Sequence, residues 1–201
     1  MTNFKAAGFD PKDVDTIIIS HFHGDHINGL RLKDGTAVFP NAEIMVPSGE
    51  WAFWMDDARM NALPEAGRGG FMAARRVFGP MAKDVKLFDA GKELVTGITS
   101  VAAPGHTPGH NVFMVASGTN KLMCLADTTN NPHLFARNPE WQAVFDMDGN
   151  KATDTRKMLL DMAATEKARV HMYHAPFPAT GFIEKAGSGY RFEPAIWSPA
   201  L

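Results

Sequence analysis

Residues 20–27 read SHFHGDHI and place three of the chain's 8 histidines within six positions. The residues just before them, 16–20 (TIIIS), have the continuous β-branched, apolar character of a strand that is covered on both faces of its sheet. His21 and His23 are two positions apart, so both side chains project from the same side of an extended chain. The sequence therefore predicts that a cluster of polar side chains begins where a buried strand ends.

Asp25 and His26 come next, where residues 25–30 are expected to turn into a helix. They approach the end of the strand from a different direction than His21 and His23, which suits two adjacent metal ions better than one. Four polar side chains are costly to remove from water unless they have partners, and metal ions turn that cost into a gain. The stretch thus predicts a metal site.

Further ligands must come from elsewhere, because one zinc ion takes about four ligands and two ions need more than this stretch offers. Three candidates each follow a predicted strand: His106, Asp127 and His174. His106 lies in a turn rich in glycine and proline, whereas Asp127 and His174 each end a short apolar strand. Since strand ends can meet at a common edge of the sheets, we expect these three side chains to join the first four.

The four motifs HFHGDH, PGHTPGH, LADTT and YHAPFP, in that order, closely resemble those of the metallo-β-lactamase superfamily. The signature of that family is HxHxDH followed by single His, Asp and His ligands, and the resemblance covers nearly the whole chain. The segment WQAVFD, the helix TRKMLLDMAA and the stretch HAPFPATGFIEKAGSGYRFEPA are also similar to the methyl parathion hydrolase-like branch.

The resemblance implies seven ligands for two divalent metal ions. The first ion would be held by His21, His23 and His106, the second by Asp25, His26 and His174, and Asp127 would bridge both. Zinc is the expected metal, with manganese, iron or cobalt as alternatives by ligand type. Asp25 is also expected to be a catalytic residue.

The resemblance further implies a hydrolase (EC 3 class) that uses a hydroxide bridging the two metals to cleave an ester, a lactone or a phosphoester. Lactonases and phosphotriesterase-like members carry an aspartate at the position of Asp127, whereas the best-known β-lactam-hydrolysing branch has a cysteine, so we do not expect β-lactamase activity. Two alternatives stay open. One is a truncated domain that binds metal with weak or no catalysis, and the other is an iron-dependent redox member of the superfamily.

The expected fold class is α/β (α+β), the αββα sandwich of the family, as a single domain over residues 1–201. Helices are predicted at 47–60, 71–77 and 153–168, with Ser48 as the cap of the first and Glu50 in its first turn. Strands are predicted at 16–20, 42–46, 85–88, 93–101, 111–116, 121–126 and 170–173, with a closing hairpin over 181–192.

The family normally carries a set of strands ahead of the HxHxDH strand, but here the motif begins at residue 21. We therefore expect a sandwich that is incomplete at its N-terminus, with an unpaired sheet edge that a longer gene product, a second copy or another partner would cover. No signal sequence is recognised in residues 1–15. The expected compartment is the cytoplasm by default, or the periplasm if a longer N-terminus exists.

Charge and composition favour a small-molecule substrate. Lys+Arg 20 against Asp+Glu 22 gives a net charge of −2, which offers no electrostatic reason to expect nucleic acid or an anionic membrane as a partner. No apolar run approaches the roughly 18 residues of a membrane span. The single cysteine, Cys124, excludes an internal disulfide and is expected to be a small buried hydrophobe.

Several other side chains have two readings. Trp51 and Trp54 either wall a substrate pocket or pack in the core. His110 is either a donor to a metal ligand or the start of the next strand. His171 is expected to be structural or on the surface, and His133 to lie in a loop rather than at the rim of the pocket.

Overall fold

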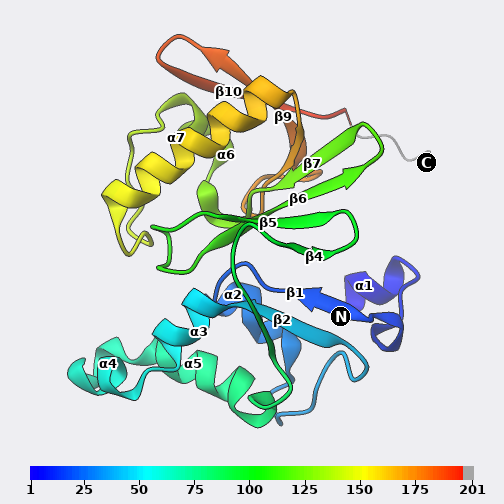
Figure 1. The fold of residues 1–201 in the computed structure, drawn as a ribbon, viewed down its shortest axis with the longest axis vertical. Coiled ribbons are helices and arrows are strands. Elements are labelled where there is room, and N and C mark those ends of the chain that lie inside the picture. Colours follow the sequence, from blue (N-terminus) through cyan, green and yellow to red (C-terminus); the bar gives the residue numbers. More distant parts are fainter. Residues whose placement is uncertain (197–201) are drawn as a thin grey trace. The chain divides into compact units, whose positions relative to one another are not determined.

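The computed structural model describes residues 1–196, and the chain divides into two compact units, residues 1–89 and the part that begins at Ala90 (Figure 1). Helices and strands are mixed in both units. The predicted mixed α/β class is therefore confirmed, and the single domain over 1–201 stays a prediction. Among the described residues, no helix is both long and apolar enough to cross a membrane.

The first unit is built on a three-stranded parallel sheet in the order β1-β2-β3. Parallel neighbours need crossover connections, and helices supply them here. The elements in chain order are α1 (Thr2–Ala6), a 3-10 turn (Pro11–Asp13), β1 (Thr16–Ile18), α2 (Gly24–Ile27), a 3-10 turn (Asn28–Leu30), β2 (Glu43–Pro47), α3 (Ser48–Trp54), α4 (Asp57–Ala62), a 3-10 turn (Glu65–Gly67), α5 (Gly69–Phe78), a 3-10 turn (Gly79–Met81) and β3 (Lys86–Phe88).

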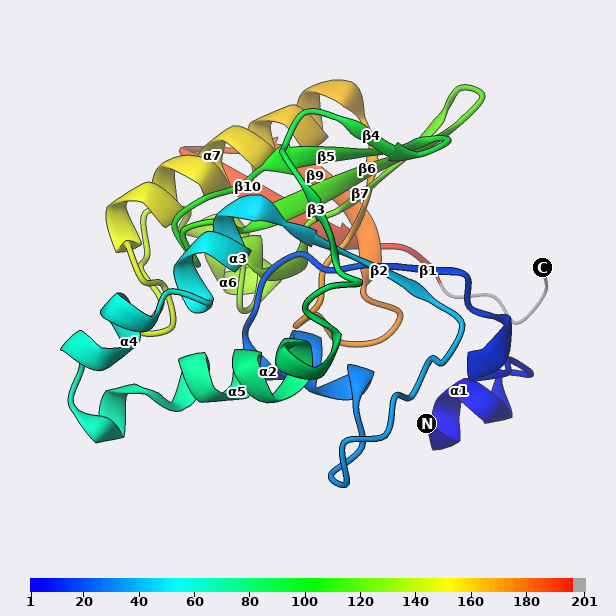
Figure 2. The same ribbon diagram turned by 60° about the horizontal axis from the view of Figure 1, so that its bottom comes forward.

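The helices α3 and α5 lie side by side in this unit (Figure 2) and bury one face of the sheet. Ile44 and Val46 alternate along β2, so both side chains point to the same face, where they pack in one apolar cluster with Phe71 and Phe78 of α5. The same cluster contains Ile19, Phe22 and Ile27, so it also holds residues 20–27, which follow β1, against the sheet.

The predicted helix over 47–60 is wrong as a single helix. Asp56 ends it, because its carboxylate accepts the backbone N–H of Ala58 (2.8 Å) and so caps a new helix, α4. Ser48 is not the cap that we expected. Its hydroxyl donates to Asp89 (2.5 Å) instead, and the helix begins without a side-chain cap.

Glu50 is completely buried and ties α3 to the loop that follows β1. Its Oε2 accepts the backbone N–H of Phe22 (2.8 Å) and the indole N–H of Trp54 (2.9 Å). The Phe22 ring is also fully buried and stacks on Phe78 with 4.3 Å between ring centroids. Phe22 therefore anchors the loop through its main chain and its ring together.

The second unit is built on a seven-stranded sheet in the order β10-β9-β8-β7-β6-β5-β4, in which only β7 and β8 run parallel. Its elements are β4 (Glu93–Val95), β5 (Ile98–Ala102), β6 (Asn111–Ser117), β7 (Asn120–Cys124), a 3-10 turn (Ala126–Thr128), α6 (Pro132–Arg137), α7 (Gly149–Glu166), β8 (Arg169–His171), β9 (Thr180–Ala186) and β10 (Gly189–Pro194).

The closing hairpin β9–β10 is confirmed, and one predicted strand is corrected. Residues 93–101 form two antiparallel strands, β4 and β5, rather than one. Gly97 makes the reversal possible because its φ of +81° is a conformation that glycine adopts without strain, and Glu93 supports the turn by accepting the Gly97 N–H (2.8 Å).

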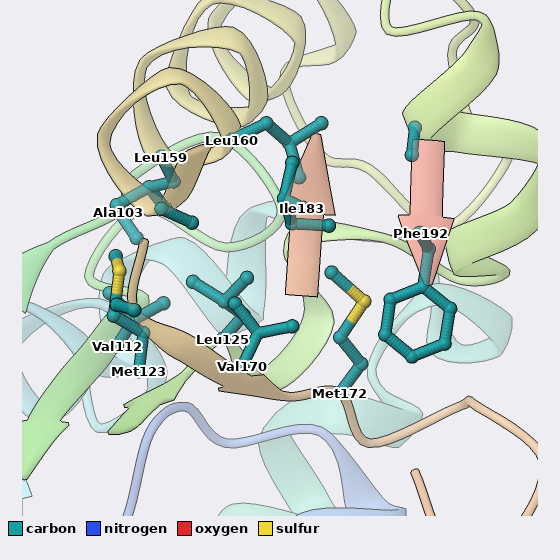
Figure 3. Close-up of a cluster of buried hydrophobic side chains, with 13 residues drawn as sticks. Ala103, Val112, Met123, Leu125, Leu159, Leu160, Val170, Met172, Ile183 and Phe192 are labelled. Atoms are coloured by element: carbon teal, nitrogen blue, oxygen red, sulfur yellow. The ribbon is translucent and has the colours of Figure 1, made fainter. Parts of the chain in front are cut away.

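The long helix α7 covers one face of this sheet, and its buried side chains form the core of the unit. Figure 3 shows Leu160 of α7 beside Ile183 of β9, with Val170 and Phe192 in the same cluster. Leu159 and Leu160 are completely buried. Burial of these side chains thus holds α7 against the sheet.

Replacing Glu50 by alanine should lower the free energy of unfolding by about 2–6 kcal/mol, because two buried N–H donors lose their acceptor and each costs about 1–3 kcal/mol. Urea denaturation measures the change. The matched control is Glu65→Ala at an exposed position, which should stay within about 0.5 kcal/mol of the parent. Equal values for the two variants would contradict the role of Glu50.

Replacing Leu160 by alanine should destabilise the chain by about 2–5 kcal/mol, since it opens a cavity under α7. Met158 lies on the same helix but is 46% exposed, so Met158→Ala should be nearly neutral. Thermal unfolding of both variants under one buffer condition checks the difference. A neutral Leu160→Ala would mean that α7 does not hold the core together.

Candidate metal centre

The first four predicted ligands lie where β1 gives way to α2. Ile19 extends the pairing of β1 by donating its N–H to the Met45 carbonyl (2.9 Å), and the sheet then ends. His23 is the residue before the first turn of α2, with extended backbone angles, and Asp25 and His26 belong to that first turn. The change from strand to helix thus turns successive side chains toward one region.

The structure brings these four side chains together within the first unit. The His21 ring lies 4.8 Å from the His23 ring and 4.1 Å from the His26 ring, measured between centroids. The Asp25 carboxylate is 3.4 Å from His26 Nε2. The Ser20 hydroxyl lies 3.0 Å from His21 Nδ1, so this contact leaves Nε2 as the ring nitrogen of His21 that is available to a metal.

The other three predicted ligands meet within the second unit. Asp127 lies in the turn after β7, and its Oδ2 is 3.3 Å from His106 Nε2 and 3.1 Å from His174 Nε2. Asp127 is only 3% exposed. His106 lies between β5 and β6 and His174 follows β8, so three strand ends supply the three side chains, as the sequence predicted.

The donor set fits divalent metal ions. Two ligands at the usual zinc distance of about 2.0–2.1 Å and at a tetrahedral angle lie about 3.3–3.4 Å from each other. The separations from Asp127 Oδ2 to His106 Nε2 and to His174 Nε2, 3.3 and 3.1 Å, are close to that value. Asp127 Oδ2 lies within this distance of one nitrogen from each of two histidines. Such a placement suits an aspartate that two ions share.

The electrostatics of this cluster favour a bound cation. Burial by itself lowers the pKa of His106, but the hydrogen bonds and charges of Asp127 and Asp146 outweigh it and raise the pKa to about 9. Burial raises the pKa of Asp146, but the hydrogen bonds with His106 and Ala143 and the charges of His106 and Arg156 together outweigh burial and lower the pKa. Two acids around one imidazole therefore favour positive charge, from a proton or from a metal ion.

Asp146 was missed as a functional residue by the sequence analysis. Its Oδ1 is 2.9 Å from His106 Nδ1, so it orients the ring and directs Nε2 toward Asp127. Such carboxylate partners of metal-binding histidines fix the tautomer and raise the basicity of the ligand. The only signal in the sequence was its place in the family-like segment WQAVFD, which gave no indication of the contact.

His110 supports Asp127 through the main chain. Its Nδ1 is 2.9 Å from the Ala103 carbonyl, and its Nε2 accepts the backbone N–H of Asp127 (3.4 Å). These contacts describe a neutral ring with the proton on Nδ1. Each of the two predicted roles of His110 is thus met in part. It contacts a candidate metal ligand, but as a hydrogen-bond acceptor rather than as a donor, and it directly precedes β6.

The two tryptophans pack in the first unit. Trp54 is 6% exposed, its ring lies edge-on to the His23 ring at 6.1 Å, and its N–H is bound by Glu50. Trp51 is half-buried and contacts Phe22 edge-on at 6.5 Å. Both thus support the histidine-bearing loop, and their role in a substrate pocket stays a prediction.

The remaining candidates lie outside these clusters. His133 belongs to α6 rather than to a loop and contacts the Phe192 ring at 5.3 Å. His171 ends β8, half-buried, and burial lowers its pKa. Cys124 is half-buried rather than buried, and burial raises the pKa of its thiol, which keeps the sulfur protonated and unreactive.

Several known proteins similar to this chain are lactonases. It is 31% identical over 126 residues to the N-acyl homoserine lactonase AttM of Agrobacterium fabrum (strain C58), covering 60% of this chain and 43% of that protein. It is 25% identical over 175 residues to the N-acyl homoserine lactonase of Bacillus cereus, covering 87% of this chain and 61% of that protein. The chain thus spans about half the length of these relatives.

Among solved structures, a dizinc quorum-quenching lactonase named AidC, solved in complex with a product, is 32% identical, with a TM-score of 0.90 over 98% of this chain and 69% of the other. These three proteins are named as lactonases, so membership in the methyl parathion hydrolase-like branch stays a prediction. Residues 2–174 match the family model of the metallo-beta-lactamase superfamily, and this chain belongs to that superfamily.

Proposed function

We propose that the chain is a dinuclear metal-dependent hydrolase that opens a lactone. The observation that carries the proposal is the Asp127 carboxylate oxygen within 3.3 Å of His106 Nε2 and 3.1 Å of His174 Nε2. The lactonases among its relatives support the substrate class. Esters and phosphoesters are the other substrates that the same chemistry serves.

The proposed ligands follow the order of the family motif. One ion takes His21, His23 and His106, the other takes Asp25, His26 and His174, and Asp127 serves both. Imidazole and carboxylate ligands suit zinc, and manganese, iron or cobalt are chemically compatible. The assignment requires that the two units act as one domain, which is the organisation that we predicted from the sequence.

When bound, two such ions supply a water-derived nucleophile near neutral pH and stabilise negative charge on the substrate oxygen. The side chains have separate tasks. Asp146 holds the His106 ring in one tautomer, and Glu50 holds the main chain between His21 and His23. Asp25, whose side chain is 52% exposed, is the proposed catalytic residue, and Trp51 and Trp54 are proposed to contact the apolar part of the substrate.

The test measures metal content and hydrolysis in the same preparation. We expect two equivalents of divalent metal per chain by mass spectrometry, and turnover of N-hexanoyl-homoserine lactone that a chelator abolishes and added zinc restores. The panel also contains a p-nitrophenyl ester, an aryl phosphotriester and a penicillin. The lactone should have the highest kcat/KM, and the penicillin should not react.

Other outcomes of the panel would overturn the proposal. Two bound ions without turnover of any compound would favour a metal-binding domain that lacks catalysis. Bound iron with consumption of dissolved oxygen would favour a redox member of the superfamily. Faster turnover of the phosphotriester than of the lactone would move the substrate class to phosphoesters.

Replacing Asp127 by alanine should lower the metal content to one equivalent or less and reduce kcat/KM by more than about 100-fold, the upper end for loss of a residue that only supports a ligand. The control is Asp154→Ala on α7, whose side chain is 82% exposed and which should bind metal like the parent. Unchanged metal content in Asp127→Ala would contradict its role as a shared ligand.

A further inference from the structure

The helix α7 touches two of the three ligand-bearing segments of the second unit, those of His106 and Asp127. The Thr155 hydroxyl donates to the carbonyl of Pro104 (2.6 Å), two residues before His106. Gly105 lies so close to α7 that a Cβ there would collide with the backbone of Ala152. The loop that carries His106 is thus packed directly on the first half of the helix.

The next residue of α7, Arg156, reaches the turn that carries Asp127. Its Nε donates to the carbonyl of Thr128 (2.9 Å), the residue after Asp127. Its Nη1 donates to the carbonyls of Pro139 (3.0 Å) and Trp141 (2.5 Å). The side chain is 1% exposed, so these backbone carbonyls replace the water that the guanidinium would otherwise bind.

The charge of Arg156 is balanced by one buried acid, which leads back to His106. Arg156 Nη2 lies 3.3 Å from Asp146 Oδ2, and the side chains of both residues are 1% exposed. The other oxygen of the same carboxylate is 2.9 Å from His106 Nδ1. One guanidinium therefore joins the loop of Asp127 through Thr128 and the ring of His106 through Asp146.

A purely structural role would also explain a buried ion pair, but it would not explain where the contacts go. Burial of a guanidinium costs more than burial of an apolar side chain of similar size, so stability alone does not favour an arginine at this position. The planar, rigid fork of the guanidinium can hold several acceptors in a fixed geometry, which a lysine cannot do. Here the guanidinium contacts Asp146, which binds His106, and the Thr128 carbonyl, which is next to Asp127. The side chains of His106 and Asp127 lie 3.3 Å apart.

We propose that Arg156 is a positioning residue of the metal site, which fixes the separation of His106 and Asp127 through Asp146 and the Thr128 carbonyl. The inference rests on the proposed function, because it assumes that these two side chains bind a metal ion. Arg156 touches neither the ion nor the substrate and acts only through its neighbours. Its loss should therefore change the affinity for metal more than the fold.

The experiment compares Arg156→Lys, Arg156→Met and Asp146→Asn with the parent chain. Zinc affinity is measured by competition with a chromophoric chelator, and thermal unfolding is measured on the metal-free proteins. We expect the affinity to fall about 10–100-fold in each variant, the range for loss of a partner of a ligand. Arg156→Lys should fall less than Arg156→Met, because an ammonium can still reach one of the acceptors. If Arg156→Met does not fold, the other two variants decide the question.

The control is Arg137→Met, the same chemical change at an exposed position of α6, which should leave zinc affinity unchanged. The double variant Arg156→Lys/Asp146→Asn should lose less affinity than the two single losses combined, because the two residues share the route through Asp146 to His106. Folded variants that bind zinc like the parent would overturn the positioning role while leaving the proposed function intact. A parent chain that binds no zinc would overturn the proposed function itself.

Discussion

The arrangement on which the second unit depends is a buried carboxylate, Asp127, with two imidazoles at 3.3 and 3.1 Å from one of its oxygens. Removing such groups from water is costly, so their positions must be set before any ion arrives. The fold does this with supports that are themselves buried. His110 binds the Asp127 backbone, and Asp146 holds the His106 ring.

Both units follow one rule, in which a distant side chain binds the main chain beside a ligand candidate. In the first unit Glu50 accepts the N–H of Phe22, between His21 and His23. In the second unit Arg156 donates to the carbonyl of Thr128, next to Asp127. Fixing the main chain sets the position from which the side chain of the ligand candidate projects, which is a reason for polar residues to be buried in these helices.

The helices therefore do more than cover the sheets. In α7 the face that carries Leu159 and Leu160 into the core also carries Thr155 and Arg156 one turn earlier, and these two reach two loops at the sheet edge. Because packing and positioning share a rigid element, a shift of the helix would move the loops with it. Residues 141–145, which adjoin Asp146, expose Trp141 and Phe145 to solvent, although the Trp141 carbonyl is held by Arg156.

The sequence by itself determined the mixed α/β class, and it predicted the two groups His21–His26 and His106, Asp127 and His174, because polar side chains at strand ends leave a local, ordered pattern. It did not determine the supports. Glu50 binds a residue 28 positions away and Arg156 binds Thr128 at the same distance along the chain, and no periodicity connects such pairs. Asp56, which splits the predicted helix, and Gly97, which splits the predicted strand, were decided by local hydrogen bonds that compete with the apolar pattern. Only the tertiary structure decided the supports, since a hydrogen bond between residues far apart in the sequence forms only where the completed fold brings its two atoms within about 3 Å of each other.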